Sequence, residues 1–131
     1  MNENAIRRLQ TEQQLRLAIR EQRIEVYYQP KVELASQHIA GIEALVRIRK
    51  TDGSMMNPND FIPLAEETGL IVPLSEQVLR RACQDMKRFL NYPGAPKHVA
   101  INLSARQFLS SSLAFHIESI LADEKLHPRH I

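Results

Sequence analysis

The sequence contains a single cysteine, no tryptophan and no long run of apolar residues. With only Cys83, the chain cannot form an internal disulfide, which fits a reducing compartment. Cys83 lies within an apolar helical pattern, and this predicts a buried, structural thiol. No apolar run approaches the ~18 residues that span a bilayer, and residues 1–16 lack the apolar segment of a signal peptide. These absences predict a cytoplasmic chain without membrane contact. A longer parent protein, anchored through an upstream region, is compatible with them.

Charge of either sign is not concentrated in this chain. The 131 residues include 17 Lys and Arg and 15 Asp and Glu, for a formal net charge of +2. Because the basic residues are interleaved with acids, the pattern argues against binding to a nucleic-acid polymer. With 44% apolar residues, the composition is that of a globular protein long enough for one small domain.

Strands alternate with amphipathic helices along the chain. Apolar periodicity and turn residues predict, in order, helix 4–22, strand 24–34, turn 35–38, strand 39–49, helix 61–68, helix 74–90, strand 98–104 and a helix within 110–126. Asn57 or Asn59 is predicted to cap helix 61–68, Gly69 to end it, and Ser75 to cap the next helix. This order predicts an α/β fold. An open sheet of only three strands would leave apolar edges and faces uncovered. A fourth strand is therefore expected after Ile131.

The second predicted strand, GIEALVRI at residues 41–48, carries charge on one of its faces. Side chains alternate along a strand, so one face is formed by the apolar residues Ile42, Ala44, Val46 and Ile48. The opposite face carries Glu43, Leu45 and Arg47. The run predicts a strand buried on both faces, where charges require a metal, a ligand or a partner.

Polar residues on the neighbouring strands extend this face. Asn102 lies on the third predicted strand, and Gln29 lies on the first, directly before Pro30. The carboxylate of Glu43 and the amide oxygen of Asn102 are hard donors that suit Mg²⁺ or Mn²⁺. Arg47 is placed to reach a phosphate near such a metal. Together these residues indicate a metal-assisted phosphoryl site at the ends of barrel-type strands.

Each of these residues also has a structural interpretation. Glu43 and Arg47 are four residues apart and could pair with each other on a solvent-facing strand. Asn102 could turn the chain into the following helix. Glu66 and Glu67 are interpreted as a solvated helix face. From the residues alone, the catalytic and the structural interpretations both stay open.

Four blocks of sequence, in this order and at these separations, resemble the first half of an EAL domain. The blocks are YYQPKVEL at 27–34, GIEALVR at 41–47, DFIPLAEETGLI at 60–71 and VAINLSARQF at 99–108. EAL domains are bacterial cyclic di-GMP phosphodiesterases named for the motif that stands here as Glu43-Ala44-Leu45. The three-residue motif alone has little value, whereas four blocks in register are highly specific. The resemblance runs from about residue 10 to the end.

The resemblance implies a fold and a division of the chain. The family fold is a modified TIM barrel whose first strand runs antiparallel to the others. Residues 23–131 would form the N-terminal half of such a domain, truncated after about three strands, and residues 1–22 a connector or first helix. A full barrel of this kind needs about 250 residues.

The resemblance also implies an activity and roles for individual residues. The family cleaves one phosphodiester of cyclic di-GMP to give linear pGpG, using two Mg²⁺ or Mn²⁺ ions. Glu43 and Asn102 match metal ligands, and Gln29, Leu45 and Arg47 match residues that bind the substrate. Later strands of the family supply further metal-binding acids, so this chain alone is expected to be inactive. Where the family usually has tryptophan after the motif arginine, this sequence has Ile48, which falls on the apolar face and is interpreted as a packing change.

A second hypothesis is a degenerate or truncated EAL module that binds cyclic di-GMP without cleaving it, or that binds a protein. The expected partners are cyclic di-GMP and, in the full protein, an upstream GGDEF or sensor domain. The open sheet edge also permits a homodimer.

Overall fold

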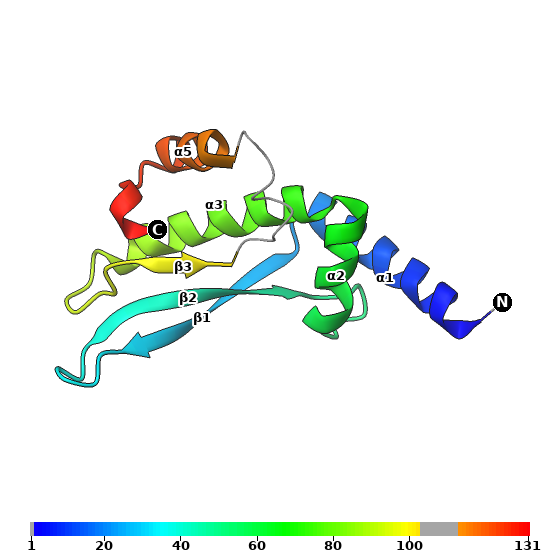
Figure 1. The fold of residues 1–131 in the computed structure, drawn as a ribbon, viewed down its shortest axis with the longest axis horizontal. Coiled ribbons are helices and arrows are strands. Elements are labelled where there is room, and N and C mark those ends of the chain that lie inside the picture. Colours follow the sequence, from blue (N-terminus) through cyan, green and yellow to red (C-terminus); the bar gives the residue numbers. More distant parts are fainter. Residues whose placement is uncertain (1, 103–112) are drawn as a thin grey trace.

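The computed structural model describes residues 2–102 and 113–131 (Figure 1). Its elements are α1 (Glu3–Arg20), β1 (Ile24–Val32), β2 (Ile39–Ile48), α2 (Pro58–Thr68), α3 (Ile71–Phe89), β3 (Val99–Ile101), α5 (Leu113–Glu124) and a 3-10 turn at Pro128–His130. The order of helices and strands is the predicted one. β3 accounts for positions 99–101 of the predicted strand 98–104, and residues 103–112 lie outside the described part.

The three strands form one sheet in the order β1-β2-β3. β1 and β2 pair as an antiparallel hairpin, and β3 joins the other edge of β2 in parallel. In this register Gln29 lies opposite Glu43 and Tyr27 opposite Leu45, while Ala100 is the β3 neighbour of Glu43. The topology confirms the predicted partial α/β barrel with an antiparallel first strand.

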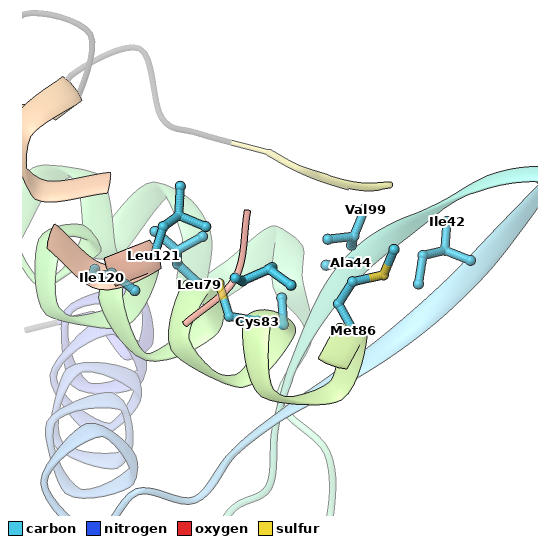
Figure 2. Close-up of a cluster of buried hydrophobic side chains, with 10 residues drawn as sticks. Ile42, Ala44, Leu79, Cys83, Met86, Val99, Ile120 and Leu121 are labelled. Carbon is cyan, nitrogen blue, oxygen red and sulfur yellow. The ribbon is translucent and has the colours of Figure 1, made fainter. Parts of the chain in front are cut away.

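The main core lies between the sheet and α3. Figure 2 shows its side chains, which come from β2 (Ile42, Ala44), α3 (Leu79, Cys83, Met86), β3 (Val99) and α5 (Ile120, Leu121). Cys83 has no exposed surface, which confirms the predicted buried thiol. Side chains of this kind each contribute roughly 1.5–3 kcal/mol when they are fully buried. This core therefore fixes the apolar face of β2 and turns its other face away from α3.

The strand alternation in GIEALVRI is confirmed, but its burial differs from the prediction. Ile42, Ala44 and Ile48 are buried, whereas Glu43 and Arg47 are half-buried. The prediction of a strand buried on both faces was wrong for this chain. The described helices pack against the apolar face, and a run of mostly apolar letters does not reveal that the other face stays partly open.

The predicted ends of α2 are confirmed, whereas the predicted start of α3 is wrong. The Asn57 side chain accepts a hydrogen bond from the Asn59 backbone N–H at 3.0 Å, and Gly69 ends α2 with φ of 80°. A left-handed conformation of this kind favours glycine. Ser75, in contrast, does not cap α3, because that helix already begins at Ile71 and Ser75 lies inside it.

Helix α1 is anchored by its second half. Leu15 and Ala18 are fully buried in a second core cluster with Ile48 and Phe61. Ile6 and Leu9, apolar residues in the first half of α1, are 52% and 57% exposed. Figure 1 accordingly shows α1 extending past α2 toward the N-terminus. Within residues 2–102 and 113–131, no helix combines the length and the apolarity that a membrane span needs.

Candidate functional site

Glu43 and Asn102 are brought together on the partly open face of the sheet. Glu43 lies in the middle of β2, and Asn102 directly follows β3, the parallel neighbour of β2. The Asn102 side chain donates a hydrogen bond from Nδ2 to Oε1 of Glu43 at 3.0 Å. The two oxygen-bearing groups that the sequence singled out are therefore adjacent in space, although they are 59 residues apart in the chain.

Gln29 and Leu45 lie on the same face. Gln29 is the direct antiparallel partner of Glu43, and Leu45 is the partner of Tyr27. Directly opposed residues of an antiparallel pair project to the same side of the sheet. All five residues that were singled out for this site thus border one surface, formed by the three strands.

Arg47 is held by the strand itself and by an aromatic ring. Its Nη1 donates to the backbone carbonyl of Val46 at 2.8 Å, and its guanidinium carbon lies 5.7 Å from the ring centroid of Tyr27. The carboxylate opposite Arg47 in the register belongs to Glu25, and it pairs with Arg49 at 2.9 Å. A planar guanidinium over an aromatic face keeps in-plane donors for an anion.

The structural interpretation of Glu43 and Arg47 as an ion pair is not supported. Within the part of the chain that the structure describes, no ion pair joins these two side chains. Glu43 is instead bonded to Asn102, and Arg47 to a backbone carbonyl.

A cleft of about 260 Å³ opens beside these residues, between the sheet and the start of α3. Its walls are mostly apolar, and they are formed by Ala44, Leu45, Val46, Pro58, Ile62, Ile71, Leu74, Val78 and Ile101, with Arg47, Glu66, Ser75 and Asn102 as the polar members. An apolar slot with a few convergent polar groups is typical of a small-molecule site.

Glu66 is a cleft residue that the sequence interpretation missed. It was interpreted, together with Glu67, as a solvated helix face, and this was wrong for Glu66, which is half-buried and lines the cleft. For Glu67 the interpretation is confirmed, because its exposed carboxylate pairs with Arg8. The available signal was helical spacing, since Glu66 lies four residues after Ile62 and shares its side of α2.

The residues near the cleft supply part of a metal site. The Glu43 carboxylate and the Asn102 amide offer hard oxygen donors side by side, which fits Mg²⁺ or Mn²⁺. Among residues 2–102 and 113–131, no three His, Cys, Asp or Glu side chains are grouped so that they could hold an ion. Glu43 and Asn102 can therefore supply two ligands of such an ion, and further ligands are needed to complete its coordination.

The opposite side of β1 holds a buried polar network that the sequence did not reveal. The Tyr28 hydroxyl donates to Oδ2 of Asp85 at 2.6 Å, and Asp85 is only 4% exposed. Arg81 and Arg88 pair with the same carboxylate, so the buried charge is compensated. Burial, together with the hydrogen bond to Asp85, raises the pKa of Tyr28 well above its usual range. This network locks α3 onto β1.

An acid, an amide and an arginine thus share one face of this partial α/β barrel, an arrangement that suits the binding of a phosphate ester. The chain is a member of the EAL domain family, because the family model described as EAL domain matches residues 12–131. The structural neighbours are also EAL domains, which are TIM-barrel-like.

Two relatives show how much of a longer protein this chain represents. MucR of Pseudomonas aeruginosa, a bifunctional diguanylate cyclase/cyclic di-GMP phosphodiesterase, is 38% identical over all 131 residues, which cover 19% of MucR. PdeB of Escherichia coli, a probable cyclic di-GMP phosphodiesterase, is 38% identical over 128 residues, or 96% of this chain and 24% of PdeB. The solved MucR phosphodiesterase in complex with cyclic di-GMP superimposes with a TM-score of 0.85 at 37% identity, covering 92% of this chain and 49% of that one. The chain thus spans about half of the solved domain and a quarter or less of either whole relative.

Proposed function

We propose that this chain is the N-terminal half of an EAL phosphodiesterase that hydrolyses cyclic di-GMP to linear pGpG. The observation that carries the proposal is the hydrogen bond between Asn102 and Glu43, on the face that also presents Arg47 to a cleft. The bond joins two hard oxygen donors beside a guanidinium, which is the combination that a metal-assisted phosphodiester site requires.

In this proposal each residue has one task. Glu43 and Asn102 hold a divalent ion, with Mg²⁺ or Mn²⁺ as the candidates. Arg47 neutralises the negative charge of a phosphate through charge-assisted hydrogen bonds. Leu45 and the apolar walls of the cleft hold a guanine base, and Gln29 contacts the nucleotide. When bound, the metal supplies Lewis-acid stabilisation of phosphoryl charge and a nucleophilic water.

The isolated chain is expected to have no phosphodiesterase activity. The described residues offer two metal donors at this face, whereas the family resemblance expects further acids from later strands. The test compares pGpG formation, with Mn²⁺, by the purified chain and by a protein that continues it through the length of the solved domain. Turnover by the longer protein alone is the expected result. Turnover by residues 1–131 would show that the missing strands are dispensable.

A second candidate function is a receptor that binds cyclic di-GMP without cleaving it. It is favoured by the largely apolar cleft beside Arg47, together with the finding that the described residues offer no group of three metal-binding His, Cys, Asp or Glu side chains. Calorimetric titration of cyclic di-GMP into the longer protein, with and without a chelator, separates the two. A receptor binds without turnover in either condition, whereas the enzyme consumes the ligand when Mn²⁺ is present. An upstream GGDEF or sensor domain, a homodimer and a cytoplasmic location remain predictions.

A further inference from the structure

Helix α2 presents two opposite sides to two different parts of the molecule. Asp60, Leu64 and Glu67 border a groove between α2 and α1. Pro58, Ile62 and Glu66 line the cleft of the candidate site. With about 3.6 residues per turn, these two sets lie on opposite sides of the helix. An 11-residue helix thus separates α1 from the cleft.

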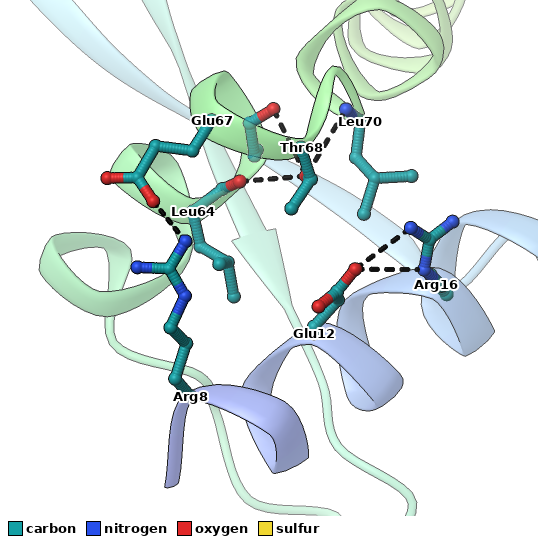
Figure 3. Close-up of polar contacts among 8 residues, drawn as sticks. Arg8, Glu12, Arg16, Leu64, Glu67, Thr68 and Leu70 are labelled. Carbon is teal, nitrogen blue, oxygen red and sulfur yellow. Dashed lines mark hydrogen bonds and ion pairs between the residues drawn. The ribbon is translucent and has the colours of Figure 1, made fainter. Parts of the chain in front are cut away.

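Two ion pairs connect the first half of α1 to α2. Arg7 pairs with Asp60 at 3.5 Å, and Arg8 pairs with Glu67. Figure 3 shows the second pair, with Arg8 reaching from α1 to Glu67 near the C-terminal end of α2. Since Ile6 and Leu9 are largely exposed, apolar burial contributes little to this contact.

The remainder of both helices is fixed more firmly. Leu15 and Ala18 anchor the second half of α1, and Phe61 and Ala65 anchor α2 in the same core cluster. The ion pairs are therefore not needed to hold the fold together. They add a contact on the side of α2 that faces α1, opposite the side that carries Ile62 and Glu66.

We propose that Arg7 and Arg8 are positioning residues for the cleft, acting through Asp60 and Glu67 on α2. The inference rests on the proposed function only for the choice of ligand. The four side chains are 45–75% exposed, so each pair is weak and screened by salt. Loss of one pair is expected to change ligand affinity at the cleft by about two- to fivefold. The reason is that a contact cannot change the free energy of ligand binding by more than its own interaction energy.

The test uses a charge swap in the full 131-residue chain. Arg8→Glu places like charges together, and Arg8→Glu combined with Glu67→Arg restores the attraction with the signs exchanged. The matched control is Arg16→Ala, which removes the 2.9 Å pair with Glu12 inside α1, also drawn in Figure 3, without touching α2. The two readouts are amide hydrogen exchange across residues 58–68 and the dissociation constant for cyclic di-GMP at low and high salt.

Arg8→Glu is expected to accelerate exchange in residues 58–68, with β1 and β2 unchanged, and to weaken cyclic di-GMP binding at low salt. The swap is expected to restore both readouts, and Arg16→Ala to leave both as in the parent chain. The proposal is overturned if exchange in α2 is unchanged, if it rises equally throughout the sheet, or if the swap does not restore it. Failure of the parent chain to bind cyclic di-GMP counts against the proposed function, while the exchange experiment still decides this inference.

Discussion

The side-chain amide of Asn102 donates to a carboxylate oxygen of Glu43 across 3.0 Å, joining the end of β3 to the middle of its parallel neighbour β2. An amide is planar, with its nitrogen and its oxygen on opposite sides of the group. Because the nitrogen is engaged by Glu43, the Asn102 oxygen is oriented by the same bond. The pair therefore presents two oxygen donors in a fixed relation, and this arrangement motivates the first prediction.

Glu43→Gln should weaken Mn²⁺ binding without destabilising the fold. The glutamine oxygen can still accept the hydrogen bond from Asn102, so the free energy of unfolding should change by no more than about 0.5 kcal/mol. Loss of the charged ligand should lower Mn²⁺ affinity at least about tenfold, as measured by electron paramagnetic resonance titration. Glu25→Gln is the matched control, because the Glu25 carboxylate lies on the neighbouring strand β1 and pairs with Arg49. Equal Mn²⁺ affinity in the Glu43 variant and the parent chain would remove Glu43 from the metal site.

Arg47→Lys should weaken cyclic di-GMP binding, although it keeps the positive charge. A lysine lacks the planar fork that engages two phosphate oxygens, and it stacks less well over Tyr27. Loss of a charged hydrogen bond corresponds to roughly 1.5–3 kcal/mol, or about a tenfold or larger rise in the dissociation constant by calorimetry. Arg49→Lys, two residues further along the chain and paired with Glu25, should bind as the parent does. If both lysine variants bind alike, Arg47 does not contact the phosphate.

The strands and their faces could be predicted because their physics is local. Alternation in residues 41–48 was enough to separate the apolar face from the face of Glu43 and Arg47. The cap at Asn57 and the end at Gly69 were equally local, since each depends on one side chain or one backbone conformation. The convergence of Glu43 with Asn102 was expected from neighbouring strands, and the register supports it.

What the sequence could not show depends on contacts between distant elements. A helix was predicted from the apolar residues of α1, but Ile6 lies about half a turn around the helix from Leu15, and only Leu15 meets the core. Glu66 and Glu67 are adjacent and chemically alike, and the packing of α2 sends one to the cleft and the other to Arg8. Helical periodicity gives a side chain its direction on a helix, but not which neighbour stands there.

Tyr28→Phe should destabilise the chain more than Tyr27→Phe. The Tyr28 hydroxyl bonds at 2.6 Å to Asp85, whose carboxylate is buried, whereas the Tyr27 side chain is 48% exposed. A hydrogen bond to a buried charged group contributes about 1.5–3 kcal/mol, and an exposed substitution typically changes stability by less than about 0.5 kcal/mol. Urea denaturation measures both variants against the parent. Equal loss in the two variants would show that the buried Asp85 does not depend on the tyrosine for its compensation.

Cys83 should make the chain less stable at alkaline pH. Burial raises the pKa of its thiol to about 11, from an ordinary value of 9.0. A raised pKa means that the folded state holds its proton longer than the unfolded state does. The contribution to stability is therefore complete below about pH 9 and is lost as the pH rises toward 11, with a slope of at most about 1.4 kcal/mol per pH unit.

The measurement compares the free energy of unfolding of the parent chain with that of Cys83→Ala. Urea denaturation gives this free energy at each pH from 8 to about 10.5. The alanine variant leaves a small cavity, which lowers stability at every pH and does not alter the slope. Tyrosines and lysines titrate in both proteins, so their effects cancel in the difference. The parent curve should fall toward the variant curve above about pH 9. Parallel curves would mean that the thiol ionises as easily in the folded chain as in the unfolded one, and that α3 does not exclude water from the core beneath the sheet.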